Sequence, residues 1–395
     1  MSDEWRGLRN ANHIGLALWF AGFFGLALLR PRGFALAFQE DGWGEWATFL
    51  AFAAAAFAFG WTALRTWRLR DSSSSVVGFV LVFLLCVGCV FVAGEEISWG
   101  QRLFGLLPAE LFLEHNYQQE INAHNLIEAI GVRSDWLTAA LALGYGVVLP
   151  ACAVWGRRAA AHEWSEALPD FEYAGWYAVV ALGVAWVPFD LSVEALELLL
   201  GLLLAIDASE RLLKSASTTS IVRPFAAAVT LFGAIVGLGA ATPVVLDHMV
   251  YRASPAELAA ANVELAALAD DLAVPGNLNG IYFRTLNTIH KRIFSAVRQN
   301  YARLPDEGRF RRLAIDRDTG EARDRSATRN RFMIDPWGSA YWFAYNKDRQ
   351  GMVVYSLGPN RRRDTHFASF PRAALEASQM EGDDIGVWLN FAERL

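Results

Sequence analysis

Two adjacent carboxylates, Glu95 and Glu96, follow an apolar run in the segment GEEISWGQR. Ionisable side chains at the end of such a run are costly in free energy, so they usually face a cavity or a charged partner. Two carboxylates side by side can act as metal ligands or as a general base. Arg102, six residues after Glu96, could provide its counter-charge.

A second group of residues capable of chemistry lies downstream, in the hydrophilic segment EHNYQQEINAHN. Glu120 and His124 are four residues apart, so on a predicted helix they share one face, and His115 lies shortly before them. A carboxylate and an imidazole at this spacing can bind one transition-metal ion. Two interpretations are open. One is a metal or acid–base site made of Glu95, Glu96, Glu120, His115 and His124, and the other is a structural polar network at the membrane surface.

The elements that must position these residues are membrane helices. The chain has 395 residues, of which 54% are hydrophobic, and this is too apolar for an ordinary soluble protein. A helix needs about 20 apolar residues to cross a bilayer. The segments that approach this length are 12–29, 46–63, 76–94, 136–155, 173–189, 191–207 and 225–247. The predicted fold class is therefore a membrane all-α domain with about seven transmembrane helices over residues 1–250.

Basic residues predict the orientation, because Lys and Arg are retained on the cytoplasmic side of the membrane. With the N-terminus in the cytoplasm, the inner connections hold ten Lys or Arg and the outer connections hold four. In a bacterial inner membrane, seven crossings then place the residues after 248 in the periplasm. This requires that 173–189 and 191–207 both cross. The net charge of −6 argues against nucleic acid as a partner.

The same orientation places further ionisable groups at the outer ends of predicted helices. Asp190, Glu194 and Glu197 lie at the outer end of the sixth predicted helix, and Asp247 with His248 lies at the outer end of the seventh. Glu194 and Glu197 are three residues apart and share one helix face. These acids raise a third hypothesis, an ion-coupled channel, although the sequence lacks the internal repeat that is common in transporters.

From residue 251 the sequence becomes typical of a soluble protein. SPAELAAANVELAALADDL begins with Ser-Pro and has apolar residues at helical spacing, and GIYFRTLNTIHKRIFSAVRQNYARL predicts a second helix, so 251–300 is expected to form a stalk. A charged loop or hairpin follows around Asp318. AYWFAY and GMVVYSLG are aromatic and β-branched, so we expect strands in a small β-domain over 301–395.

Three ordered blocks, DPWGSAYWFAY, VVYSLGPN and GDDIGVWL, resemble the C-terminal β-domain of the major pseudopilin of type II secretion systems. The resemblance covers residues 335–389 and implies an extracytoplasmic α+β, pseudopilin-like domain. In that family, the loop between the last strand and a final D-I-x-x-W turn binds calcium. The resemblance implies backbone carbonyls near Ser356 and Leu357 and the side chains of Asp383 and Asp384 as its ligands, which suits a cation that takes six to eight oxygens.

The chain also departs from the pseudopilin pattern. Arg361, Arg362 and Arg363 stand where the family has an acidic loop, and three cations would weaken a calcium site. Asp383 and Asp384 could instead cap a turn. The family's N-terminal processing signal is missing from the start of the chain, so we do not expect it to assemble as a pilus.

Two functions follow from these patterns, besides the channel. The first is an integral inner-membrane protein that presents the pseudopilin-like domain to a periplasmic or envelope protein. The second is a metal-dependent membrane enzyme that acts on a lipid or lipid-linked substrate at the outer leaflet through the Glu and His residues named above. The EEISWGQR block also resembles that of multi-span bacterial membrane proteins without an assigned activity, so this resemblance favours neither function.

Overall fold

The computed structural model describes residues 3–38, 42–68, 73–104, 106, 108–109, 111–112, 120–124, 127, 135–155, 168–186, 190–215, 222–249, 251–272, 334–339, 341–345, 351–365 and 380–390. The chain forms two compact units. The first comprises Met1–Ile97 and Gly131–Val244, and the second comprises Ser98–Ile130 and Val245–Leu395. The second unit includes residues 98–130, which the sequence analysis assigned to the transmembrane domain over 1–250.

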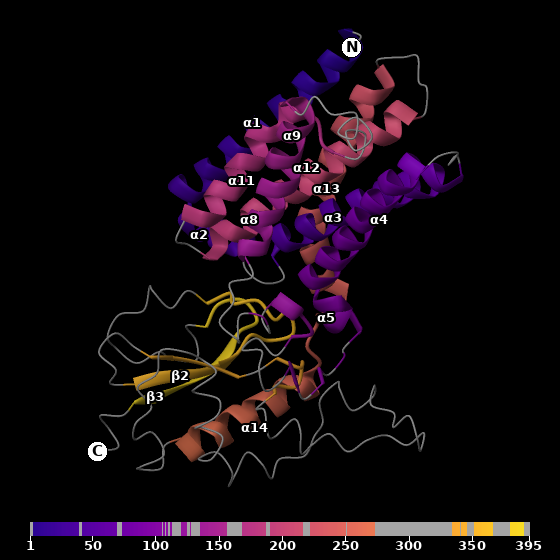
Figure 1. Ribbon diagram of the computed structural model, residues 1–395. Helices are drawn as coiled ribbons and strands as arrows, with labels where there is room; N and C mark the ends of the chain where they lie inside the picture. The colour runs from indigo at the N-terminus through magenta and orange to yellow at the C-terminus, as the bar shows by residue number, and fades with distance from the viewer. Residues whose placement is uncertain are drawn as a thin grey trace, which may run out of the picture. The chain divides into compact units, whose positions relative to one another are not determined.

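The first unit is a bundle of helices (Figure 1). Its elements are α1 (Asp3–Leu29), α2 (Pro31–Phe38), α3 (Trp43–Arg68), α4 (Ser73–Glu96), α8 (Asp135–Leu143), η2 (Gly144–Val148), α9 (Leu149–Trp155), η3 (Phe171–Tyr173), α11 (Ala174–Trp186), α12 (Asp190–Ser215) and α13 (Val222–Met249). The last turn of α13, from Val245, belongs to the second unit. Four stretches are long and apolar enough to cross a membrane: Arg6–Leu29, Trp43–Arg68, Val76–Glu96 and Trp136–Trp155, with a shorter apolar stretch at Gly233–Met249. The chain is therefore a membrane-associated helical protein.

The four apolar stretches coincide with the first four predicted helices. The fifth predicted helix corresponds to α11, whose 13 residues are about 20 Å long and shorter than the roughly 30 Å hydrocarbon core. The sixth and seventh correspond to α12 and α13. Seven crossings therefore remain a prediction.

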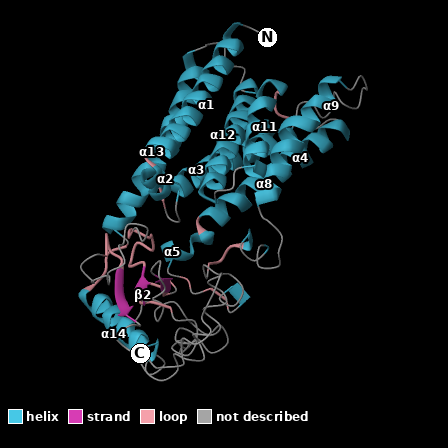
Figure 2. Cartoon of the chain, turned by 90° about the vertical axis from the view of Figure 1, so that its left-hand side faces the viewer, coloured by secondary structure: helices cyan, strands magenta, loops and turns pink. Residues whose placement is uncertain are grey.

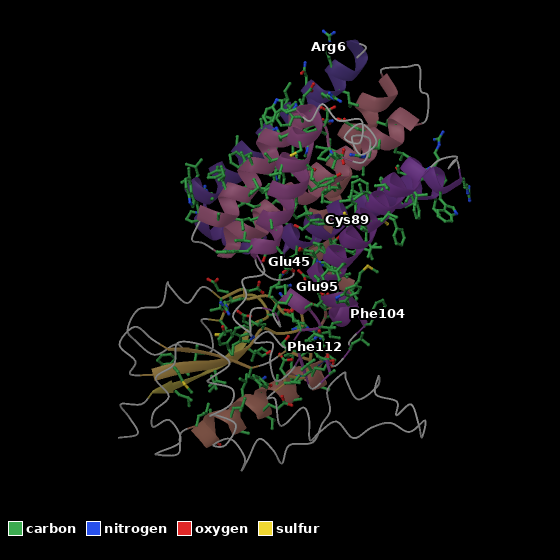
Figure 3. All side chains as sticks on the ribbon, viewed as in Figure 1. Arg6, Glu45, Cys89, Glu95, Phe104 and Phe112 are labelled. Carbon is green, nitrogen blue, oxygen red and sulfur yellow. The ribbon has the colours of Figure 1, made fainter. Side chains whose placement is uncertain are left out.

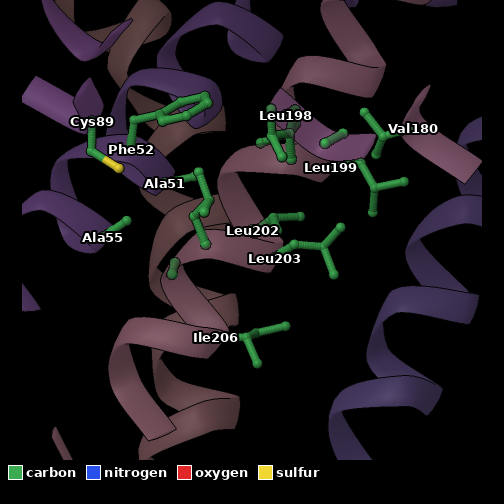
Figure 4. Packing of buried hydrophobic residues seen from close by; sticks show 14 of the residues in the cluster. Ala51, Phe52, Ala55, Cys89, Val180, Leu198, Leu199, Leu202, Leu203 and Ile206 are labelled. Atoms are coloured by element: carbon green, nitrogen blue, oxygen red, sulfur yellow. The ribbon is translucent and has the colours of Figure 1, made fainter. Parts of the chain in front are cut away.

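Helix α12 lies inside the bundle. Its residues from Ala195 to Ala208 are buried except Glu197, and side chains along it pack between α3 and α11 (Figure 4). A Cβ on Gly201 would lie 3.0 Å from the Cβ of Ala51 on α3. Small residues therefore let the two helices approach closely, as is common in membrane bundles.

A π-helical turn, η2, joins α8 to α9. The N–H of Leu149 donates to the carbonyl of Gly144, and the next residue is Pro150, which has no N–H to continue the ladder. Gly146 within this turn packs on Tyr177 of α11, where a Cβ would lie 2.0 Å from the ring. A side chain at Gly146 therefore requires α8–α9 and α11 to separate.

We expect Gly146→Ala to destabilise the bundle by about 2 kcal/mol or more, because overpacking a tight contact typically costs 1–3 kcal/mol. Gly144→Ala, in the same turn, is the matched control, since no heavy atom lies within 4 Å of its added Cβ. The measurement is the thermal unfolding midpoint of each variant in detergent. Equal midpoints for the two variants would contradict the packing argument.

The second unit contains a three-stranded antiparallel sheet and a helix beside it (Figure 2). The strands β1 (Trp342–Tyr345), β2 (Gly351–Ser356) and β3 (Ile385–Asn390) pair in that order, and α14 (Pro255–Leu272) contacts β2 and β3. The remaining elements are η1 (Ser98–Gly100) and α5 (Gln101–Phe104). The two predicted strands are confirmed, whereas the predicted D-I-x-x-W turn is a strand, with Trp388 opposite Val353.

Helix α14 begins at the predicted Ser-Pro. The Ser254 hydroxyl accepts the Glu257 N–H at 3.2 Å, and the Glu257 carboxylate accepts the Ser254 N–H at 2.8 Å. This is a reciprocal capping box. The predicted helix over 280–304 and the loop around Asp318 lie outside the described residues.

Candidate functional site

An acidic cluster gathers at one end of the helical bundle. Glu96 interacts electrostatically with Glu194, Glu197, Glu45 and Glu95, and Glu45 and Glu95 are labelled at this end in Figure 3. The carboxylate of Glu197 accepts the hydroxyl of Thr138 at 2.8 Å. The structure thus brings together the acids at 95–96 and 194–197, as the sequence predicted, and adds Glu45. Glu96 is half-buried, and Arg102, its predicted counter-charge, has no described side chain.

Three further residues that the sequence placed at this end, Asp190, Asp247 and His248, are not found in the described cluster. Asp190 begins α12, but its side chain lies outside the described part. Asp247 and His248 belong to the second unit, where Asp247 forms an ion pair with Arg362 and His248 is exposed.

The residues after Glu96 form a left-handed turn. Ser98, Trp99 and Gly100 have φ of 46°, 54° and 74° in succession. For a residue other than glycine, this conformation costs roughly 1–2 kcal/mol because Cβ crowds the following carbonyl. Neighbouring contacts must therefore hold Ser98 and Trp99 in place.

The segment around Glu120 supplies those contacts. The Ser98 hydroxyl donates to the Glu120 carboxylate at 2.6 Å, and the side-chain oxygen of Gln101 accepts the Ile121 N–H at 2.6 Å. The Asn122 amide donates to the same carboxylate oxygen at 3.1 Å. Ser98, Gln101, Glu120 and Asn122 are all buried. We call these four residues the turn clamp.

The prediction that one helix carries Glu120 and His124 is wrong. Residues 120–122 are irregular, and helical structure begins only at Ala123, because the Glu120 carboxylate is turned toward Ser98 and Asn122. His115 lies outside the described residues. The geometry around Glu120 thus agrees with the structural polar network that the sequence left open.

A second acidic cluster lies in the β-domain, at the loop between β2 and β3. Asp364 interacts electrostatically with the two predicted acidic calcium ligands, Asp383 and Asp384, and is also hydrogen-bonded to Asp383. Burial raises the pKa of Asp383 to about 7, helped by a hydrogen bond and repulsion from Asp364. Burial also raises the pKa of Asp384 to about 7, against hydrogen bonds from Thr365 that lower it.

Each of these two aspartates also caps a turn with one oxygen. Asp383 accepts the Asn360 N–H at 3.2 Å, and Asp384 accepts the Thr365 N–H at 2.7 Å. The second oxygen of Asp384, Oδ1, is buried and has no hydrogen-bond partner among the described residues. Turn capping and cation binding are therefore compatible roles for this pair.

The other two predicted ligands connect the motif blocks. The Ser356 hydroxyl donates to Asp335 of the DPWG turn at 2.5 Å and accepts the Gly358 N–H at 3.0 Å. Asp335 also accepts the N–H groups of Trp337 and Ser339. Leu357 is buried in the sheet core with Trp342, Val353 and Tyr355, against which Trp388 packs. The Ser356 hydroxyl is thus already bonded, and only carbonyl oxygens of 356 and 357 suit the predicted role.

The three arginines beside this cluster each have their own partner. Arg361 donates to the carbonyl of Trp337, Arg362 pairs with Asp247, and the guanidinium of Arg363 lies 5.0 Å from the centroid of the Trp342 ring. Arg363 also lowers the pKa of Asp384, but this is a minor effect beside burial. The expected repulsion of a cation by all three arginines is therefore weaker than the sequence suggests.

Sequence reasoning missed a buried polar network in the bundle. The Asp207 carboxylate accepts the Tyr145 hydroxyl at 2.8 Å and hydrogen bonds from Arg211 at 3.0, 3.1 and 3.2 Å. Nearby on α12, Glu210 accepts the Tyr173 hydroxyl at 2.5 Å and the Asn12 amide at 3.0 Å. The sequence did contain one signal for this network, because Asp207 and Arg211 lie four residues apart on an apolar helix and so share one face.

Among the residues that the structure describes, no three His, Cys, Asp or Glu side chains are arranged to hold a metal ion. Comparisons of the chain with family models, curated proteins and solved structures gave no match.

Proposed function

We propose that the chain is an integral inner-membrane protein whose β-domain, formed by α14 and β1–β3, binds an envelope protein in the periplasm. The observation that carries this proposal is the separate core of the β-domain. Trp337, Tyr341 and Tyr355 are buried there, and the Tyr341 hydroxyl donates to the buried Glu264 of α14 at 2.6 Å. A domain with its own core on a membrane base is suited to presenting a binding surface.

Two features support the pseudopilin-like character of this domain. The DPWG turn and the S-x-G block meet through the bond between Asp335 and Ser356, and the third block forms the neighbouring strand. The periplasmic location rests on the distribution of Lys and Arg along the sequence.

The test combines topology with site-specific crosslinking in cells. A photo-crosslinking residue at exposed Glu381 in the β-domain should give a discrete adduct with an envelope protein, and one at lipid-facing Leu18 should not. Trp337→Ala, which opens a cavity in the β-domain core, should abolish the adduct. The proposal fails if exposed β-domain positions give no adduct, or if a C-terminal alkaline phosphatase fusion is inactive.

We further propose that the β-domain binds calcium at Asp364, Asp383 and Asp384. One oxygen of Asp384 is buried without a hydrogen-bond partner among the described residues, and Asp364 interacts electrostatically with both Asp383 and Asp384. A hard cation bound here would neutralise this local negative charge. Carbonyl oxygens of Ser356 and Leu357 would complete the ligand set. The bound ion would hold the β2–β3 loop together by neutralising its charge.

The alternative, a metal-dependent enzyme acting on a lipid, lacks a comparable observation. Its proposed base or ligand, Glu120, is 7% exposed and braces the left-handed turn. If the enzyme hypothesis were right, His124→Ala should remove bound transition metal from the purified protein.

A further inference from the structure

The turn after α4 exposes a tryptophan while burying its neighbours. Trp99 is 44% exposed, whereas Ser98 and Gln101 are 3% and 2% exposed. Within the turn clamp, the Glu120 carboxylate bonds Ser98 and the Ile121 N–H bonds Gln101, and the left-handed backbone between Ser98 and Gln101 leaves Trp99 exposed. Backbone strain that is held in place by buried contacts often serves a function.

Three further large apolar side chains are exposed in the residues that follow. Phe104 is 66% exposed, Leu106 is 38% exposed and Leu111 is 57% exposed. These residues lie beyond the apolar stretch that ends at Glu96. Several large apolar side chains exposed along one short segment indicate a surface that another apolar phase covers.

We propose that Trp99, Phe104, Leu106 and Leu111 form an interfacial surface that inserts into the bilayer boundary at the end of α4. Trp99 is three residues from Glu96, so the chain can carry it at most about 11 Å from the end of the helix. If α4 crosses the bilayer and ends at its surface, this distance keeps Trp99 within the headgroup region, where tryptophan and tyrosine are enriched.

The clamp meets the other requirement of an interfacial segment, which is that its polar groups are bonded away from the lipid. Ser98, Gln101, Glu120 and Asn122 bond one another or the backbone on the buried side. This inference depends on α4 crossing the bilayer and is independent of partner binding by the β-domain.

Spin labels on the full-length chain in phosphatidylcholine bilayers test the proposal. In a background with Cys86, Cys89 and Cys152 replaced by alanine, single cysteines are introduced at Phe104 and Leu111. Leu18, on a candidate span, gives the lipid reference, and exposed Glu381 gives the water reference. The quantity measured is the ratio of collisions with oxygen to collisions with a water-soluble nickel chelate.

We expect this ratio to be severalfold higher at 104 and 111 than at 381, because oxygen concentrates in the bilayer and the chelate is excluded from it. Ratios at 104 and 111 equal to the ratio at 381 would overturn the proposal. Glu120→Ala should lower the ratio at 104 by releasing the turn, whereas Glu120→Gln keeps an acceptor for Ser98 and should preserve it. A ratio that Glu120→Ala leaves unchanged would remove the clamp from the proposal.

Discussion

Replacing Asp207 with asparagine should lower the stability of the helical bundle by about 3–5 kcal/mol, because it leaves the partly buried Arg211 without its counter-charge. Both side chains lie on α12, inside the bundle, and the Tyr145 hydroxyl would also lose a charged acceptor. Removing one partner of a buried ion pair destabilises the protein far more than replacing both partners with apolar side chains, because the remaining charge stays buried and unpaired. The measurement is the free energy of unfolding in mixed detergent micelles.

Two control variants separate this charge effect from general disruption. Asp207→Leu combined with Arg211→Met should recover much of the lost stability, because apolar side chains of similar volume can replace a buried pair. Glu172→Gln breaks the 3.0 Å ion pair with Arg9 at a position where the Glu172 side chain is 49% exposed, so it should cost less than about 1 kcal/mol. If Asp207→Asn costs no more than Glu172→Gln, the buried pair does not stabilise the bundle.

In a calcium chelator, raising the pH from about 5 to about 8 should destabilise the β-domain. Folding raises the pKa of Asp383 and of Asp384 from 3.8 to about 7, so the folded domain binds more protons than the unfolded chain between these values. This stabilisation is complete below the unfolded pKa and is lost as the pH rises through about 7. For the buried Asp384 alone, the loss is at most about 4 kcal/mol.

Calcium should reverse this loss, because the ion replaces the protons that the carboxylates release. Hydrogen exchange of β2 and β3 in the full-length protein, corrected for the intrinsic pH dependence of exchange, reports the stability of the domain. Asp384→Asn should flatten the pH dependence and abolish protection by calcium, whereas Glu381→Gln, at an exposed neighbour, should preserve both. Stability that rises with pH in the chelator would contradict the predicted linkage.

Hydropathy predicted the four stretches that are long and apolar enough to cross a membrane, because each is an apolar run that can be found without knowledge of its neighbours. Helix α12 shows where this approach ends. Glu194, Glu197 and Asp207 interrupt its apolar character, and only the surrounding helices explain how a helix with charged side chains can be buried. Burial of α12 is a property of the bundle and not of its own sequence.

The chemistry around Glu95 and Glu96 was predicted only in part. Local spacing identified a polar cluster and grouped Glu194 with Glu197, but Glu45, from an earlier helix, could not be found by spacing. The i, i+4 argument for Glu120 and His124 failed because a long-range bond from Ser98 to Glu120 takes precedence over local helix formation. In the β-domain, the motif pointed to the adjacent Asp383 and Asp384 but did not identify Asp364, which interacts electrostatically with both.

Helix α12 also has an electrical consequence. Between Glu197 and Asp207 it carries nine residues without an ionisable group, all of them buried, over about 15 Å. A proton cannot step along α12 across such an insulating interval, so this helix does not provide a conducting path of the kind that the channel hypothesis needs. If α12 crosses the bilayer, this interval covers about half of the roughly 30 Å hydrocarbon core, so a large share of the membrane voltage falls across it. Glu197 and Asp207, at its two ends, are then separated by that share of the voltage.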